Sequence, residues 1–404
     1  MKSGWVSKKL GAVTTKIGSG ATPLGGAEAY KEAGISLIRS LNIHDWGFKE
    51  DNLAHIDDAQ ASRLSNVVVE PNDVLLNITG ASIARCCLVP PDILPARVNQ
   101  HVSIIRPVTH QLSPVFLYYL LTSNTYKNRL LQTGEDGGST RQAITKAQIQ
   151  EFQVTYPESL AEQQRIVAIL DEAFDAVATA KANAEKNLQN ARALFESHLQ
   201  SVFTQRGQSK TVPIGDVGEV FDGPHATPKT VDAGPIFLGI SALEDGIINL
   251  SETRHVTPDD FRKWTRRVRP QANDIVFSYE TRLGQAAIIP EALDCCLGRR
   301  MGLVRLDQNR IEPRYFAYQY ISPPFRQFLN SRTVRGATVD RISVKEFPSF
   351  PIVLPQLAEQ KLIADRLDAF RAETQRLESI YQQKLVALES LKKSLLHQAF
   401  SGQL

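Results

Sequence analysis

Two segments of the chain carry apolar residues at steps of three and four positions, which is the spacing of one face of an α-helix. The first segment covers residues 167–202 and the second covers residues 367–395. Pro and Gly are absent from the sequence between Leu160 and Gln205 and between Leu357 and Ser401. The pattern therefore predicts two long helices of about 40 residues each.

The apolar stripe on each predicted helix is narrow and is sustained over about five heptads, as is typical of a coiled coil. A lone helix with such a stripe is unstable in water, so each helix needs a partner. The simplest partner for each helix is the other one. We therefore expect an internal coiled coil.

The sequence that opens the first long helix occurs a second time. Residues 160–166 read Leu-Ala-Glu-Gln-Gln-Arg-Ile, and residues 357–363, which lie 197 positions later, read Leu-Ala-Glu-Gln-Lys-Leu-Ile. The same shift continues as far as Phe203 and Phe400 without an insertion. A repeat of this length indicates two whole structural units and not a short stacking motif.

A stretch of about 150 residues precedes each long helix, and its short apolar runs between turns predict strands. In both copies a Gly- and Pro-containing turn comes early, at residues 20–23 and 223–228. An Asn-Asp turn then precedes a predicted hairpin in each copy, followed by a further strand and by a helix that opens with Pro. We expect an α+β fold with two similar globular α/β modules. The predicted boundaries are residues 1–157 for the first module, 158–207 for the first long helix, 208–355 for the second module and 356–404 for the second long helix.

Composition narrows the class of protein only slightly. The chain has 404 residues, 42% hydrophobic residues and a formal net charge of +3, which by itself does not predict a nucleic-acid partner. The cysteines form the pairs Cys86-Cys87 and Cys295-Cys296, which lack metal-binding spacing, so we expect buried apolar residues in a reducing cytosol. The N-terminus lacks the apolar core of a signal peptide, and the apolar runs are too short to span a bilayer. We expect a soluble, cytoplasmic protein.

The chain resembles the specificity subunits of type I restriction–modification systems along essentially its whole length. The resemblance is carried by the Leu-x-Glu-Gln opening of each long helix, which follows Pro157 in one copy and Pro355 in the other. The Gly-x-Thr turn upstream of Ile144 and of Ile342, and the Asn-Asp turn before a strand, add to it.

The resemblance implies a fold and a set of partners. Each module would be a target-recognition domain that reads one half of a split double-stranded DNA sequence. The two helices would form an antiparallel coiled coil with an internal pseudo-twofold repeat, and would fix the separation of the half-sites. The subunit would have no catalytic site and no cofactor. It would recruit two methyltransferase subunits and, in the full enzyme, two restriction subunits, and those partners would bind S-adenosylmethionine, ATP and Mg. The candidate partner-binding residues are Glu162, Gln163, Glu359 and Gln360.

Candidate DNA-binding residues follow from general rules of recognition, because phosphates are bound mostly by Lys and Arg, guanine favours Arg, and adenine favours Asn or Gln. The strongest cluster is residues 262–269, where five basic residues surround Trp264 and predict a phosphate-binding strand or loop. The alternative is a solvated face with a partly buried Trp. Arg299-Arg300 stands where the first module has Asn99-Gln100-His101, as two different half-sites would require. The full set of candidates is Ser82, Arg85, Asn99, Gln100, Arg141, Arg262, Lys263, Arg266, Arg267, Arg269, Arg282, Arg299, Arg300 and Arg335. The second module has Val339 at the position of Arg141, so any role of Arg141 is not symmetric.

The first rival to DNA recognition is a methyltransferase. Ser322-Pro323-Pro324-Phe325 resembles the catalytic tetrapeptide of amino-methyltransferases, but the chain has no Gly-rich turn upstream to hold the methyl donor, and a turn that ends the preceding helix is the simpler interpretation. Glu359-Gln360-Lys361 is similar to a nuclease motif but is predicted to lie at a helix start, where Glu favours the dipole. No phosphate-binding loop of the Walker type is present. The second rival is a coiled-coil scaffold that binds only protein.

Overall fold

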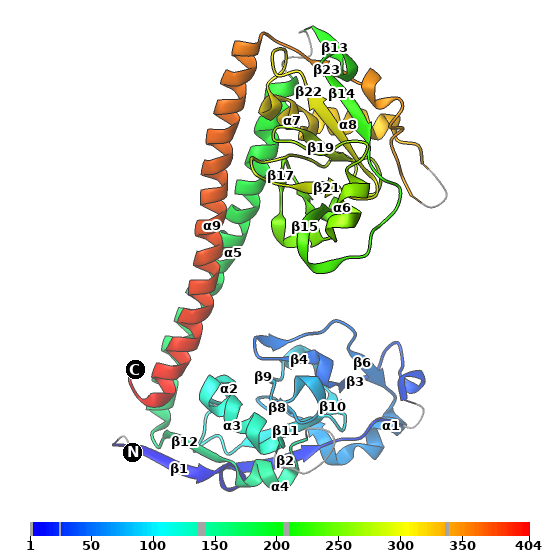
Figure 1. Ribbon diagram of the computed structural model, residues 1–404. Coiled ribbons are helices and arrows are strands. Elements are labelled where there is room, and N and C mark those ends of the chain that lie inside the picture. The colour runs from blue at the N-terminus through cyan, green and yellow to red at the C-terminus, as the bar shows by residue number, and fades with distance from the viewer. Residues whose placement is uncertain (1–2, 24–25, 136–142, 205–209, 336–338) are drawn as a thin grey trace. The chain divides into compact units, whose positions relative to one another are not determined.

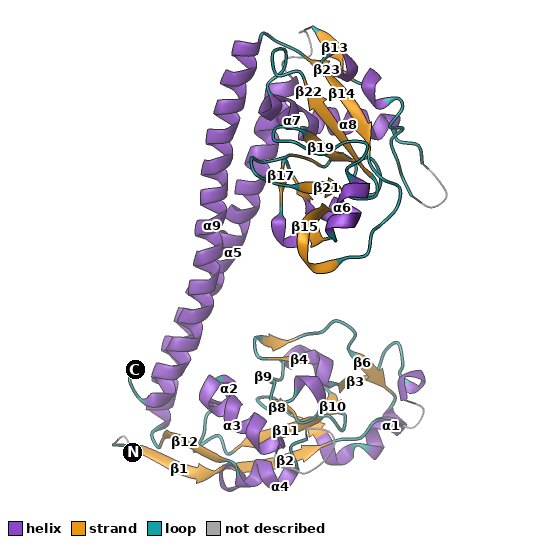
Figure 2. Ribbon diagram, viewed as in Figure 1, coloured by secondary structure: helices purple, strands orange, loops and turns teal. Residues whose placement is uncertain are grey.

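The computed structural model describes residues 3–23, 26–135, 143–204, 210–335 and 339–404 (Figures 1 and 2). The chain forms two compact units. Unit 1 combines residues 1–183 with residues 384–404, and unit 2 consists of residues 184–383. Each unit therefore contains one globular module together with part of both long helices.

Module 1 is built on two four-stranded sheets. The first is antiparallel, with the order β2 (Thr14–Ser19), β11 (Val102–Pro107), β8 (Val74–Asn77) and β9 (Cys86–Leu88). The second has the order β6 (Ala54–Ile56), β3 (Ile35–Ile38), β10 (Ala96–Val98) and β7 (Val68–Val69), in which β3 and β10 are parallel. Two pairs complete the strands, namely β1 (Trp5–Lys9) with β12 (Gln153–Pro157) and β4 (Ile43–His44) with β5 (Gly47–Phe48).

The described part of module 1 also contains four short α-helices. They are α1 (Asp58–Arg63), α2 (Pro114–Thr122), α3 (Asn124–Glu135) and α4 (Lys146–Glu151). Helix α2 begins where the sequence predicts, because Pro114 fits the first turn and the Ser113 hydroxyl accepts a bond from the backbone N–H of Phe116 at 3.4 Å. Its apolar side chains Phe116, Leu117 and Leu120 are fully buried in the core beside the first sheet.

Module 2 repeats this strand order, except that its second sheet has three strands in the described part of the chain. Its antiparallel sheet has the order β14 (Gly218–Asp222), β22 (Met301–Leu306), β19 (Ile275–Ser278) and β20 (Ala286–Ile288). The second sheet is β18 (Arg254–His255), β15 (Val231–Leu238) and β21 (Cys295–Leu297), and the pairs are β13 (Thr211–Pro213) with β23 (Pro351–Val353) and β16 (Leu243–Glu244) with β17 (Ile247–Ile248). The helices are α6 (Pro258–Trp264), α7 (Pro313–Ile321) and α8 (Pro323–Arg332). The shared strand order confirms that the repeat consists of two similar α/β modules.

The structure settles two sequence motifs of unclear role. The cysteines are free and buried, and the two pairs lie on strands that do not correspond, β9 and β21. Ser322 is fully buried between α7 and α8, where its hydroxyl donates to the carbonyl oxygen of Gln319 at 2.6 Å. Ser123 makes the same bond to Leu120 between α2 and α3, also at 2.6 Å. The expected turn is thus limited to Ser322, which lies between the two helices, and Pro323, Pro324 and Phe325 form the first turn of α8.

The long helices are α5 (Leu160–Thr204) and α9 (Leu357–Ser401), with 45 residues each, slightly more than predicted. In unit 1 the first half of α5 packs against the last part of α9. Lys181 pairs with Glu389 at 2.9 Å, and the ammonium of Lys392 lies 4.9 Å from the ring centre of Phe174. Nearer the start of α5, Arg165 donates to the carbonyl oxygen of Leu404 at 3.1 Å. The helices of unit 1 therefore run in opposite directions.

Unit 2 shows the same arrangement with the other ends of the helices. Arg192 pairs with Glu378 at 3.1 Å, and the rings of Phe195 and Phe370 are stacked with their centres 6.4 Å apart. The order of these contacts again makes the two helices antiparallel, which confirms the internal coiled coil. No helix in the described part of the chain combines the length and the apolar character that a bilayer crossing needs.

A buried glutamine joins each long helix to the module of its own unit. In unit 1 the Gln163 side chain has an exposed fraction of 0%. Its amide oxygen accepts from the backbone N–H of Ser113 at 2.8 Å, and its NH₂ group donates to the carbonyl oxygens of Gln111 at 2.9 Å and Pro157 at 2.8 Å. One side chain thus satisfies three backbone groups that would otherwise be buried without partners.

Gln360 does the same in unit 2, where it also has an exposed fraction of 0%. It accepts from the N–H of Glu312 at 2.8 Å and donates to the carbonyl oxygens of Arg310 at 3.0 Å and Pro355 at 2.9 Å. This repeated bond set explains the Leu-x-Glu-Gln opening of each helix. The Gln is required there to connect the helix to the turn before α2 or α7.

We expect Gln163→Leu to lower the free energy of unfolding by at least about 3 kcal/mol, because three backbone groups lose their partner and each buried unpaired group costs roughly 1–3 kcal/mol. Denaturant unfolding followed by circular dichroism measures this change. Gln164→Leu is the matched control, since Gln164 is exposed on the same turn of α5. Equal stability of the two variants would contradict the role of the buried amide.

We expect the four cysteines to resist thiol reagents in the folded protein. Burial raises the pKa of Cys87, Cys295 and Cys296 to about 12, and raises the pKa of Cys86 as well. At pH 8 the reactive thiolate is then on the order of 10⁻⁴ of each of the first three groups. Titration with a chromogenic disulfide before and after addition of denaturant checks this, and rapid reaction of the folded protein would contradict it.

Candidate nucleic-acid interface

Three segments of module 1 meet at one end of its antiparallel sheet. They are the β8–β9 loop (residues 78–85), the β10–β11 turn (residues 99–101) and residues 143–144, and we call them loop cluster 1. The backbone N–H of Ile78 donates to the carbonyl oxygen of His101 at 3.0 Å, and the N–H of Ile144 donates to the carbonyl oxygen of Ile78 at 2.9 Å. Backbone bonds therefore bring together segments that are distant in sequence.

Module 2 has the same construction in loop cluster 2, which consists of residues 279–285, 298–300 and 340–342. The N–H of Tyr279 donates to the carbonyl oxygen of Arg300 at 3.2 Å, and the N–H of Ile342 donates to the carbonyl oxygen of Tyr279 at 2.8 Å. The match confirms that residues 99–101 and 298–300 are equivalent turns. Most of the side chains that they present are different.

The side chains of loop cluster 1 differ in exposure and in hydrogen bonding. Asn99 is only 4% exposed, and its side-chain oxygen accepts from the backbone N–H of His101 at 3.0 Å, so it shapes the turn. Gln100 is exposed. Ser82 accepts from the Asn77 amide at 3.1 Å. Arg85 is half-buried, and its guanidinium has no hydrogen bond or ion pair with other described residues; it lines with Ser82 and His101 a surface pocket of about 440 Å³.

The arginines of loop cluster 2 also fall into two kinds. Arg282 donates to the carbonyl oxygens of Ile240 at 3.1 Å and Ser241 at 2.9 Å, so its guanidinium stabilises the module. Arg300 pairs with Glu280 at 2.7 Å. Arg299 is exposed, and it has no hydrogen bond or ion pair among the residues described. Arg341 is exposed as well, and among the described residues its side chain has no hydrogen bond or ion pair either.

Tyr279 contributes a neutral group to loop cluster 2. It is 5% exposed, and burial, followed by the negative charge of Asp222, raises the pKa of its phenol. The hydroxyl therefore stays protonated at neutral pH.

The basic cluster at residues 262–269 differs in part from the predicted strand or loop. Arg262 and Lys263 lie in the last turn of helix α6, and only the residues after Trp264 form a loop, so the predicted strand or loop is wrong for its first part. The helix was signalled in the sequence by Thr257, whose side chain caps it, and by Pro258 in its first turn.

Acidic neighbours neutralise much of this cluster. Arg262 pairs with Asp259, Lys263 with Asp260 at 3.5 Å, and Arg269 with Asp294 at 2.8 Å. These pairs are exposed and leave the side chains accessible. Arg266 is exposed and is unpaired among the described residues, so it is the cation most available to a phosphate.

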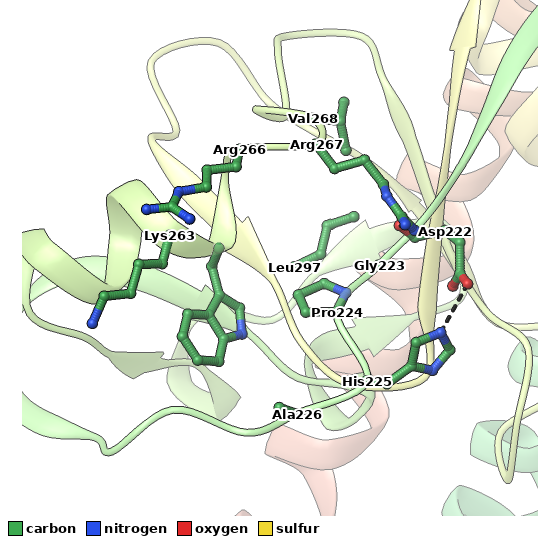
Figure 3. A pocket seen from close by; sticks show the side chains of 11 residues that line it. Asp222, Gly223, Pro224, His225, Ala226, Lys263, Arg266, Arg267, Val268 and Leu297 are labelled. Atoms are coloured by element: carbon green, nitrogen blue, oxygen red, sulfur yellow. Dashed lines mark hydrogen bonds and ion pairs between the residues drawn. The ribbon is translucent and has the colours of Figure 1, made fainter.

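The same cluster forms one wall of a pocket of about 520 Å³ (Figure 3). Lys263 and Arg266 lie on one side of it, and Asp222 and His225, which are joined at 3.0 Å, lie on the other. Arg267 donates to the backbone carbonyl oxygen of Asp222 at 3.2 Å. The sequence identified residues 223–228 only as a turn, and the signal that could have raised their interest is their pairing with residues 20–23 in the repeat.

The remaining predicted residues are placed as follows. Arg141 lies outside the residues that the structure describes. Arg335 is exposed. Glu162 pairs with Arg165 at 2.8 Å, and Glu359 is exposed. The burial of Gln163 and Gln360 is at odds with the expectation that they bind a partner, because both amides are used within the chain. Over the described ranges, no group of three or more His, Cys, Asp or Glu side chains is arranged to hold a metal ion.

The comparison with protein families gives one match that occurs twice. The model described as the type I restriction modification DNA specificity domain matches residues 2–189 and residues 208–386. Each match covers one module and continues into the long helix that follows it.

Individual relatives agree with the family match. The chain is 21% identical over 416 residues to a putative type I restriction enzyme MjaX specificity subunit of Methanocaldococcus jannaschii, covering 99% of this chain and 93% of the relative. It is 28% identical over 149 residues to the StySPI specificity subunit of Salmonella potsdam, but that match covers 36% of this chain and 32% of the relative.

Solved structures share the fold. A chain in a study of complex assembly and conformational transition of the type I R-M system has a TM-score of 0.77 at 20% identity, covering 100% of this chain and 99% of that one. The HsdS subunit from Thermoanaerobacter tengcongensis has a TM-score of 0.66 at 20% identity, covering 100% and 98%. Specificity subunits of type I systems are non-catalytic. The double match over most of its length shows that the chain belongs to the type I restriction modification DNA specificity family, as a subunit with two specificity domains.

Proposed function

We propose that this chain reads a bipartite double-stranded DNA target, with one half-site contacted by each module. In this proposal the functional divisions are residues 1–157, 158–207, 208–355 and 356–404. The observation that carries the proposal is the presence of the same loop cluster on the same sheet in both modules, with different exposed side chains. A shared scaffold with variable loop tips is what two related readers of different sequences require.

The charges around each module support contact with DNA. Arg85 in loop cluster 1 and Arg299 in loop cluster 2 are unpaired among the described residues, as is Arg266 beside the pocket of Figure 3. Unpaired guanidinium groups bind phosphate oxygens or guanine without first breaking an internal ion pair. The methyltransferase and restriction subunits would then act on DNA that this chain has bound, and the chain itself would need no catalytic residues.

The long helices are proposed to set the separation of the half-sites. Each has 45 residues without a break. A helix cannot absorb an inserted residue as a loop can, because one residue rotates the following residues by about 100°. This constraint accounts for the absence of insertions in the repeated helices, while the modules differ in length.

The same helices offer surfaces to partner subunits. Helix α9 exposes the apolar side chains of Leu362, Ile380, Val386 and Leu391. We propose that two methyltransferase subunits, which carry S-adenosylmethionine, bind this region together with Glu162 and Glu359. Two restriction subunits, which use ATP and Mg, would join them in the full enzyme. The complex would act on DNA in the cytoplasm.

Shortening both long helices by one heptad tests the spacing role. Deleting residues 179–185 and 385–391 removes opposite stretches, because Lys181 pairs with Glu389. The loss is about 10.5 Å of helix, or roughly three base pairs. We expect the complex with its methyltransferase partner to prefer a spacer about three base pairs shorter. Affinity should also fall, because three base pairs turn one half-site by about 100° relative to the other.

Methylation of a plasmid library with randomised spacer lengths measures this preference. Deletion of residues 179–185 alone is the control, since it shifts one helix against the other and should weaken every spacer. An unchanged spacer preference in the double deletion would show that the helices do not set the distance.

We expect Arg266→Ala to weaken DNA binding by the same factor for all sequences and to reduce the slope of log K against log salt by about 0.9, the value of one phosphate contact. Binding of the methyltransferase complex is measured by fluorescence anisotropy between 50 and 300 mM salt. Arg262→Ala, whose guanidinium is paired with Asp259, should change the slope less. Absence of any salt-dependent DNA binding by the wild-type complex would instead favour a scaffold that contacts only protein.

A further inference from the structure

We propose that Gln100 and Arg299 are base-reading residues, with Gln100 selecting adenine in one half-site and Arg299 selecting guanine in the other. His101 and Arg300 are positioning residues that hold the two turns. This inference rests on the proposed DNA-reading function and adds to it the residues and the bases.

Gln100 and Arg299 occupy the same place in the two modules. Each is exposed, and each immediately precedes a residue that is held at the same point of the loop cluster. In module 1 the Nδ1 atom of His101 lies 2.5 Å from the hydroxyl of Thr79. In module 2 Arg300 pairs with Glu280 at 2.7 Å. Thr79 and Glu280, the partners of His101 and Arg300, stand near the start of their hairpin loops. The same contact is therefore made by a hydrogen bond in module 1 and by an ion pair in module 2.

The hydrogen bonds of Gln100 define the direction of its amide. Its Nε2 atom lies 3.1 Å from Nε2 of His101, and its Oε1 atom accepts from the hydroxyl of Thr22. Because the Gln100 NH₂ group can only donate, the His101 Nε2 atom must be the acceptor, and the imidazole proton is then on Nδ1, facing Thr79. His101 and Thr22 thus hold the amide of Gln100 from both sides.

The groups that remain on Gln100 match adenine. One N–H of the amide is used by His101 and one lone pair of its oxygen by Thr22, which leaves one donor and one acceptor. In the major groove, adenine presents the N7 acceptor beside the N6 donor, and a Gln amide contacts both. Guanine presents two acceptors there, so the fixed amide would pair with only one of them.

Arg299 has the complementary property. Glu280, the acidic residue of the hairpin loop at residues 279–285, is engaged by Arg300 and not by Arg299. The guanidinium of Arg299 is unpaired within the described chain and offers only donors, which match the O6 and N7 acceptors of guanine. Adenine places a donor at one of these positions and would repel one N–H of the fork.

The two exposed residues can be exchanged to test this. The chain is prepared with its methyltransferase partner, and the recognised sequence is first mapped by sequencing the methylated DNA. Competition binding then uses duplexes that carry all four base pairs at each position of both half-sites. The variants are Gln100→Arg, Arg299→Gln and the Arg266→Ala variant as a phosphate-contact control.

We expect wild type to prefer adenine at one position of the first half-site and guanine at one position of the second by roughly 5- to 150-fold. Gln100→Arg should move the first preference toward guanine, and Arg299→Gln should move the second toward adenine, with other positions unchanged. Both residues are exposed, so thermal unfolding should be unaltered.

Two outcomes would overturn the inference while leaving the proposed function intact. One is a uniform loss of affinity in Arg299→Gln with a smaller salt slope, as in Arg266→Ala, which would make Arg299 a phosphate contact. The other is unchanged base preference in both exchange variants. If the wild-type complex bound no DNA at all, the proposed function itself would fail.

The positioning residues have a separate readout. His101→Ala should reduce the adenine preference at the same single position as Gln100→Ala, without a change in salt slope. Arg300→Ala should relax the guanine preference, and Arg300→Lys should restore part of it, because Lys can still pair with Glu280. A loss of affinity that is equal at all base positions would show that these side chains only support the fold.

Discussion

The buried amide of Gln163, repeated by Gln360, is the interaction on which the relation between each long helix and its module depends. Each amide fills three backbone bonds at the point where the module ends and the helix begins. Because both glutamines are buried and the amide can form these bonds in only one orientation, the helix leaves the module in a defined direction. A hydrophobic contact alone would fill the space but would not set that direction.

An ion pair between an Arg and a buried Asp stabilises the antiparallel sheet of each module. In module 1 the Arg106 guanidinium binds both oxygens of the fully buried Asp73 at 2.7 and 2.9 Å, and Arg305 binds Asp274 in module 2 at 3.0 and 2.7 Å. Each pair joins the middle strand of the sheet, β11 or β22, to the turn before β8 or β19. The loop clusters at the other end of these strands are therefore carried on rigid elements, as precise base contact requires.

The periodic features of this fold could be predicted from sequence, and the contacts between distant segments could not. Steps of three and four residues predict α5 and α9 because one helix face repeats at that spacing. The ion pair of Arg269 with Asp294 joins residues 25 positions apart and could not be predicted, whereas the other two pairs of the basic cluster join residues three positions apart. The burial of Gln163 was equally hidden, because a Gln near a helix start is usually exposed. Equivalence of the 99–101 and 298–300 turns was predictable, since the repeat aligns them.

The two equivalent turns present different chemical groups to the two halves of a split target. Module 1 presents an uncharged amide held by a histidine and a threonine, whereas module 2 presents a guanidinium and keeps a second one paired with Glu280. As base contacts in the groove, neither Gln100 nor Arg299 neutralises a phosphate, so neither adds to the slope of log K against log salt. The two half-sites then differ in the base that each turn accepts and not in the salt dependence of these two contacts. Because both modules belong to one chain, binding of one half-site raises the effective concentration of the other module at its own half-site.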